Sequence, residues 1–201
     1  MILAIDTSAS ISVAVTSDDG TEVFAAASEF SPRGHAELLA DMVYGALDAA
    51  NVGKGQVSAV VVGTGPAPFT GLRVGLVTAR MLAFAWKVPL WGVCSLDAVG
   101  AKYGDALVVA DARRREVYVA RYKSGERVSG PEVVAPGEVA VYPDDLVVGR
   151  GAQLYPGVFV SAFDEDPDPQ WLVLEALRQG GLGRDLSTEP LYLRRPDVHG
   201  A

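Results

Sequence analysis

The stretch from Gly63 to Lys87, GTGPAPFTGLRVGLVTARMLAFAWK, decides the fold of this chain. It follows an apolar run at residues 58–62 that is typical of a buried strand. A turn rich in glycine and proline comes next, and Thr70 is the expected N-cap of a long helix. The only charged residues of this helix, Arg73, Arg80 and Lys87, are seven apart and form one narrow stripe. Because nearly every other position is apolar or small, we expect the helix to be covered on more than one side.

Small side chains recur every four residues along this helix, at Gly71, Gly75, Ala79 and Ala83. Such a row lets another element approach closely. The pattern therefore predicts the chain's own sheet on one side and a partner protein on the other, and a plain core helix is the alternative. The two arginines exclude a membrane span, which needs about 20 residues with almost no charge.

The bulk composition indicates an ordinary globular protein of one domain or two small ones. The chain has 201 residues, of which 49% are hydrophobic, and a net charge of −8. An acidic chain is a poor stand-alone binder of nucleic acid, and the short clusters Arg113–Arg115 and Arg194-Arg195 are interpreted as solvated surface or partners of acids. The single cysteine, Cys94, cannot form an intramolecular disulfide, which fits a reducing compartment. The opening residues 1–6 are typical of a strand, and we expect no secretory signal.

Two segments share the order apolar strand, aspartate, polar turn and second strand. The first strand ends at Asp6 and the other at Asp111, with partner strands at residues 11–15 and 117–122. This similarity predicts an internal duplication, although two unrelated hairpins also look alike. The two aspartates are candidates for a carboxylate pair facing a cleft, or for simple turn formation. Between them, apolar spacing of three and four residues predicts an amphipathic helix over His35–Ala50.

Residues for metal or covalent chemistry are scarce. The chain has two histidines, His35 and His199, and no H-x-x-x-H or G-x-S-x-G motif. A metal site needs several convergent ligands, so none is predicted. The Gly63-Thr-Gly65 turn matches neither glycine-rich nucleotide motif and is a weak anion-binding signal.

Distinctive segments run in order along nearly the whole chain: Leu3–Ser8, Gly63–Pro66, Phe69–Gly75, Gly92–Leu96, Ala110–Arg113, Glu116–Tyr118 and Pro190–Arg194. Together they resemble the TsaB (YeaZ) family, the bacterial partner subunits in tRNA threonylcarbamoyladenosine formation. The resemblance implies an α/β fold of the actin-like, Hsp70-like class, built from two ribonuclease-H-like subdomains. Residues 1–103 are then the first subdomain, residues 104–185 the second, smaller one, and residues 186–201 a tail expected to pack back on the first.

The resemblance also implies a function as a non-catalytic activating subunit. Members of the family pair with the catalytic paralogue TsaD, helped by the ATPase TsaE, in threonylcarbamoyl transfer to the adenosine beside the anticodon of ANN-decoding tRNAs. We expect this chain to have no cofactor of its own, and ATP and metal to bind to the partner proteins. It meets tRNA only through the complex, forms at most a weak homodimer through the same helices, lies in the cytoplasm and contacts no membrane.

The family pattern places the partner interface on the two long helices of the first subdomain. We expect Leu76→Asp or Gly75→Trp to abolish pairing while leaving the chain folded. The implied interface residues are His35, Leu38, Leu39, Met42, Leu72, Arg73, Gly75, Leu76, Ala79 and Arg80.

A vestigial nucleotide cleft is implied at Asp6, Thr7, Ser8, Gly65 and Asp111. Here the chain departs from the family, because Ala67-Pro68 replaces glycine-serine, and Pro68 removes a backbone N–H that could bind an anion. A stand-alone ATPase or kinase using Asp6 and Asp111 is therefore a less favoured alternative. A metallopeptidase is disfavoured because paired histidines are lacking.

Overall fold

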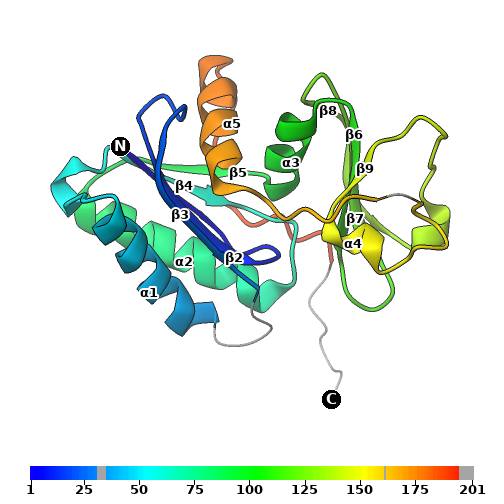
Figure 1. Ribbon diagram of the computed structural model, residues 1–201, viewed down its shortest axis with the longest axis horizontal. Coiled ribbons are helices and arrows are strands. Elements are labelled where there is room, and N and C mark those ends of the chain that lie inside the picture. Colours follow the sequence, from blue (N-terminus) through cyan, green and yellow to red (C-terminus); the bar gives the residue numbers. More distant parts are fainter. Residues whose placement is uncertain (31–34, 161, 195–201) are drawn as a thin grey trace.

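The computed structural model describes residues 1–30, 35–160 and 162–194, which form two β-sheets flanked by helices (Figure 1). The first sheet has the order β3-β2-β1-β4-β5. Strand β1 is antiparallel to β2 and parallel to β4. The strands span Ile2–Asp6 (β1), Ile11–Thr16 (β2), Val23–Glu29 (β3), Ala59–Gly63 (β4) and Leu90–Val93 (β5).

The first sheet is covered on both faces, which explains why every residue of β1, β2 and β4 is buried. Alternate side chains point to opposite faces of a strand. Leu3 and Ile5 therefore pack with α1 and α2, whereas Ile2 and Ala4 pack with α5 on the opposite face (Figure 1). The helices span His35–Ala49 (α1), Phe69–Trp86 (α2) and Pro169–Gly181 (α5).

The second sheet repeats the pairing of the first. Its order is β8-β7-β6-β9, and β6 is antiparallel to β7 and parallel to β9. Asp111 ends β6 as Asp6 ends β1. This repeat confirms the predicted duplication and the actin-like arrangement of two related halves. The remaining elements are Ser95–Tyr103 (α3), Ala106–Asp111 (β6), Val117–Lys123 (β7), Glu126–Val134 (β8), Val147–Val148 (β9), Arg150–Gln153 (α4) and the 3₁₀ turns Lys54–Gln56 (η1) and Pro136–Glu138 (η2).

Both long helices of the first half lie where the sequence predicts them. The predicted cap of α2 is wrong, however, because Pro68 rather than Thr70 is the N-cap. The helix begins earlier because Leu72 already donates its backbone N–H to the Pro68 carbonyl, at 3.4 Å. Within the described residues, no helix has the length and hydrophobicity of a membrane span.

The last described segments return to the first sheet. Helix α5 falls inside the predicted second unit, yet Leu172 and Ala176 pack against the first sheet. Beyond it, residues 186–194 form what we call the C-terminal strap. The Gly92 amide donates to the Leu186 carbonyl at 2.9 Å, and the Leu191 amide donates to the Thr64 carbonyl at 2.9 Å. The strap thus lies along the β5 edge, while the predicted subdomain boundaries stay predictions.

Candidate partner-binding surface and inter-sheet cleft

The small-residue row of α2 faces the chain's own sheet. The Gly75 amide donates to Thr7 Oγ1 at 3.2 Å, and that hydroxyl donates to the Gly71 carbonyl at 2.9 Å. A Cβ at Gly75 would lie 2.4 Å from Thr7 Oγ1. The end of β1 therefore packs closely against this row, so the row meets the chain's own sheet, which is one of the two coverings that the sequence predicts for the helix.

Half of the predicted interface residues are buried in the chain's own core. Leu76→Asp would place a charge there, and Gly75→Trp would drive a ring into Thr7, so both variants should unfold the chain rather than test an interface. Leu38 and Met42 are partly buried against the same core. The side chain of His35 lies outside the described residues. The fully buried members are Leu39, Leu72, Gly75, Leu76 and Ala79.

The two predicted arginines contact the C-terminal strap. The Arg73 guanidinium lies 5.5 Å from the ring centroids of both Phe69 and Tyr192. Arg73 Nε also donates to the Tyr192 hydroxyl at 2.8 Å. Arg80 Nη2 donates to the Thr188 carbonyl at 2.8 Å and to Glu189 Oε1 at 3.1 Å. These arginines therefore fix the strap along one flank of α2.

A different set of side chains on α1 and α2 is exposed. Val77, Met81 and Phe84 follow one stripe of α2 and are 52%, 67% and 87% exposed, and Tyr44 on α1 is 79% exposed. We call these four residues the outward face. A groove of about 620 Å³ lies between the two helices beside it. Contiguous exposed apolar surface marks interaction sites in soluble proteins. The groove is lined by Ala40, Val43, Tyr44, Leu47, Asp48, Val52, Gly53, Thr78, Leu82 and Trp86.

A cavity of about 170 Å³ lies between the two sheets. Ser8 lines it from the first half and Asp111 from the second, as predicted for the cleft. Asp111 is already engaged, because it accepts the Arg113 amide at 2.7 Å and pairs with that guanidinium at 3.2 Å. Thr7 is held against α2, and the Gly65 amide donates to Ser95 Oγ at 3.1 Å. The cleft therefore unites only two of the five predicted residues.

The Asp6 carboxylate is fully buried and fully bonded. One oxygen accepts the Ser8 amide at 2.8 Å and the Ser8 hydroxyl at 2.6 Å, and the other accepts the Ser95 hydroxyl at 2.5 Å. Burial raises the pKa of Asp6 to about 6, against the lowering effect of these hydrogen bonds. A Cβ at Gly63 would lie 1.7 Å from the carboxylate. The residues at Asp6 thus do not fit a magnesium-bound nucleotide.

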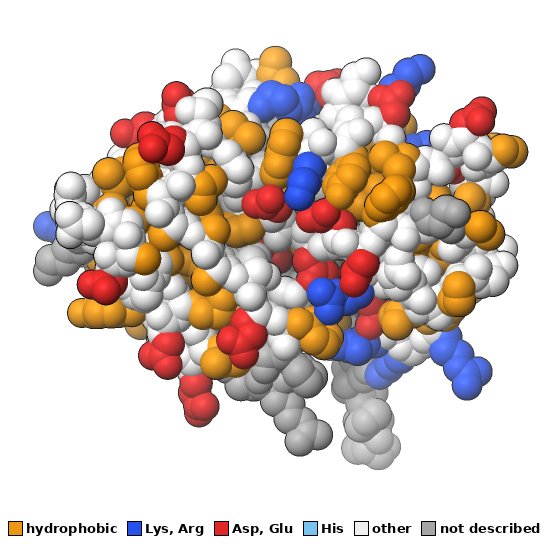
Figure 2. All heavy atoms as spheres, in the orientation of Figure 1, with side chains coloured by type: hydrophobic (Ala, Val, Ile, Leu, Met, Phe, Trp, Pro, Cys, Tyr) orange, Lys and Arg blue, Asp and Glu red, His pale blue; other side chains and the backbone are white. Residues whose placement is uncertain are grey.

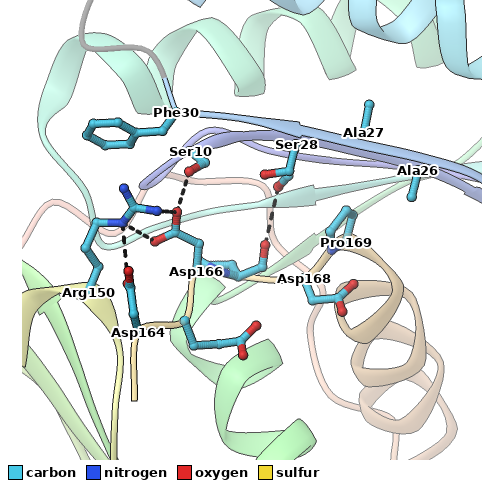
Figure 3. Close-up of a pocket in the computed structure, with 13 residues that line it drawn as sticks. Ser10, Ala26, Ala27, Ser28, Phe30, Arg150, Asp164, Asp166, Asp168 and Pro169 are labelled. Carbon is cyan, nitrogen blue, oxygen red and sulfur yellow. Dashed lines mark hydrogen bonds and ion pairs between the residues drawn. The ribbon is translucent and has the colours of Figure 1, made fainter. Parts of the chain in front are cut away.

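A second pocket, of about 560 Å³, separates β3 from the acidic loop at residues 164–169 (Figure 3). Arg150 Nη2 pairs with Asp166 Oδ2 at 2.7 Å, and its guanidinium carbon lies 4.2 Å from the Phe30 ring centroid. Ser10 donates to the same carboxylate (Figure 3). These bonds join the two halves across the pocket.

Metal-ligating side chains are not clustered in the described part of the chain. Among residues 1–30, 35–160 and 162–194, no three His, Cys, Asp or Glu side chains are grouped so that they could hold a metal ion. The absence of a metal from this chain stays a prediction. Cys94 is buried, and burial raises the pKa of its thiol far above the ordinary value. This thiol is therefore a packing group rather than a nucleophile.

Comparisons with known proteins agree with this geometry. The family model for TsaD, tRNA N6-adenosine threonylcarbamoyltransferase, matches residues 27–161. The Escherichia coli tRNA threonylcarbamoyladenosine biosynthesis protein TsaB is 34% identical over 171 residues, covering 77% of this chain and 73% of that protein. The solved structure of YeaZ from Pseudomonas aeruginosa superposes with a TM-score of 0.77 at 29% identity, covering 96% of this chain and 99% of that one.

Other relatives differ in length. An uncharacterised protein of Mycobacterium tuberculosis is 44% identical over 169 residues, covering 83% of this chain and 78% of that protein. An uncharacterised protein of Mycobacterium leprae is 40% identical over 209 residues, but the chain spans only 56% of its length.

Proposed function

This chain belongs to the TsaB (YeaZ) family, and we propose that it serves as the non-catalytic partner of a TsaD-type transferase in tRNA threonylcarbamoylation. The observation that carries the proposal is the outward face of α1 and α2. It leaves Phe84, Met81 and Tyr44 largely exposed, although large aromatic and aliphatic side chains are the usual anchors of a buried interface. In this proposal the transferase covers these side chains.

The groove beside the outward face supports helix-against-helix packing. Its floor is apolar, with Val43 and Leu47 from α1 and Leu82 and Trp86 from α2. An amphipathic helix typically docks into such a groove through apolar side chains at helical spacing. Two copies of the chain would also cover each other here, so we propose weak self-association of the isolated chain. Sedimentation over a range of concentrations tests this proposal.

The state of Asp6 supports a non-catalytic role. A nucleotide-bound magnesium ion takes carboxylate oxygens as ligands, but both oxygens of Asp6 are occupied by hydroxyl and amide donors inside the protein. In this proposal ATP and metal belong to the transferase and to an ATPase of the TsaE type, and the complex works in the cytoplasm, where tRNA is found. The stand-alone ATPase alternative would need an open carboxylate at the same position.

An omit-one reconstitution tests the proposed function. The transferase, the ATPase, tRNA, ATP and the enzyme that makes threonylcarbamoyl-AMP are mixed with or without this chain, and modified adenosine is counted by mass spectrometry. We expect modification to depend on the chain. Equal modification without it would contradict the proposal, and ATP turnover by the isolated chain would then be the next assay.

A further inference from the structure

A second hollow lies at the C-terminal end of α2, where the chain turns into β5. It has a volume of about 590 Å³. Ala83, Val88 and Leu90 give it apolar walls, and Phe84 lines it as well. Because Phe84 is the most exposed member of the outward face, the hollow and the outward face form one continuous surface.

The hollow and the groove beside α1 lie on opposite flanks of α2. An α-helix turns by about 100° per residue, so residues two apart point to nearly opposite sides. Thr78 and Leu82 line the groove, whereas Arg80, which is two residues from each of them, lines the hollow. Val77 and Phe84 therefore form an exposed ridge with a depression on each side.

The C-terminal strap reaches the rim of the hollow. Arg80, which lines the hollow, donates from Nη2 to the Thr188 carbonyl at 2.8 Å and to Glu189 Oε1 at 3.1 Å. The Glu189 side chain is nevertheless 82% exposed, so it is open to a further contact. A protein segment that fills the hollow therefore lies against the strap.

We propose that the partner transferase straddles α2, with one segment in the groove beside α1 and a second, apolar segment in the hollow, against the strap. This inference rests on the proposed function, which makes the transferase the occupant of the outward face. A stable interface of standard size takes about 20 to 30 residues from each side. The outward face and the groove provide fewer than that, whereas the hollow and the strap bring the same surface close to this size.

The charges at the rim indicate a carboxylate on the second segment. Over α1 and the first sheet, in the left half of Figure 2, hydrophobic and acidic side chains prevail and Lys and Arg side chains are few. Lys87 is an exposed cation that lines the hollow. Among the described residues, none pairs with the Lys87 ammonium group, whereas Arg80 is paired with Glu189. A carboxylate on the transferase would make this rim electrostatically complementary to it.

The test measures the dissociation constant of the chain and the transferase by calorimetry. Ala85 lines the hollow and is exposed near the end of α2, so Ala85→Glu places a carboxylate in the hollow. The matched control, Ala49→Glu, changes an exposed alanine at the end of α1. We expect Ala85→Glu to weaken binding about tenfold and Ala49→Glu to leave it unchanged, with native melting temperatures in both.

The charge of the rim has its own test. Lys87→Gln should weaken binding about threefold at low salt, whereas Lys123→Gln, which changes an exposed lysine of β7, should bind as the native chain does. Native affinity in Lys87→Gln would contradict the carboxylate on the transferase.

Cross-linking tests the contact with the strap. Cys94, the single cysteine, is buried, so Glu189→Cys adds an accessible thiol for a photo-reactive benzophenone. Light should link residue 189 to the transferase, whereas the same label on Val128→Cys should give no link. If the native chain forms no complex with the transferase, the proposed function fails. If the complex forms but Ala85→Glu keeps the native affinity, or residue 189 gives no link, only this inference is overturned.

Discussion

Asp6 ends β1, and its buried carboxylate accepts hydrogen bonds from three donors. An aspartate in an open cleft would suggest a metal ligand. The sequence alone does not distinguish such a ligand from a buried, hydrogen-bonded aspartate. Here Ser8 and Ser95 take both oxygens, and Gly63 leaves just enough room for them. The sequence predicted the position of this aspartate, but not its burial, because Ser95 is 89 residues away in the chain.

Asp6 should make the stability of the chain depend on pH. Its folded pKa of about 6 lies above the ordinary value of 3.8, so the folded state binds this proton more tightly. The resulting stabilisation is fully present below about pH 4 and is lost as pH rises through 6, a change of about 3 kcal/mol. Asp6→Asn should remove this fall in the free energy of unfolding, measured by urea denaturation at several pH values. The exposed carboxylate variant Asp41→Asn serves as the control, and identical profiles for Asp6→Asn and the native chain would refute the assignment.

At the scale of elements, the strap can pass close to β5 only because residue 92 is a glycine. A Cβ at Gly92 would lie 2.1 Å from the Ser187 carbonyl oxygen, which is backbone and cannot move aside alone. Gly92→Ala should therefore displace the strap and lower the free energy of unfolding by about 2 kcal/mol. Urea denaturation measures the loss, and hydrogen exchange should show weaker protection of the Leu191 amide, which now donates to Thr64.

A second glycine, Gly45, is the matched control, because its replacement by alanine should raise the free energy of unfolding. Gly45 lies in α1, and a Cβ there would meet nothing within 4 Å. Gly45→Ala should stabilise the chain by up to about 1 kcal/mol, because alanine is the better helix former. If Gly92→Ala is as stable as Gly45→Ala and keeps its strap protected, the proposed steric role of Gly92 is wrong.

Helix α2 shows which parts of the fold the sequence predicts and which it does not. Its position follows from the preceding strand and turn, but a helix that is apolar nearly all round has no periodic signal to tell its inner stripe from its outer one. The sequence predicts that the chain's own sheet and a partner both cover the helix, but it does not show that the small-residue row is the side that faces Thr7. Strand β8 has a weak sequence signal, because its first five residues are exposed and lack an apolar pattern.

At the scale of the whole molecule, the repeated strand order was predictable because each half carries its own apolar strand, aspartate and turn. The return of α5 to the first sheet was not, since it is a long-range contact that leaves no local pattern, and the return of the tail was expected only from the family resemblance. The sum of these contacts buries both faces of the first sheet and leaves the outward face of α1 and α2 uncovered. The central claim of the proposed function is that the partner transferase binds this uncovered face.

The most direct measurement is the dissociation constant of the chain and its TsaD-type partner, determined by calorimetry for the native chain and two variants. Phe84→Asp changes the outward face, and Val128→Asp changes another exposed apolar residue, on β8. Both should keep the native melting temperature. We expect Phe84→Asp to weaken binding about thirtyfold or more, the effect of losing an interface anchor worth about 2 kcal/mol, and Val128→Asp to leave it unchanged. Native affinity in Phe84→Asp would contradict the account.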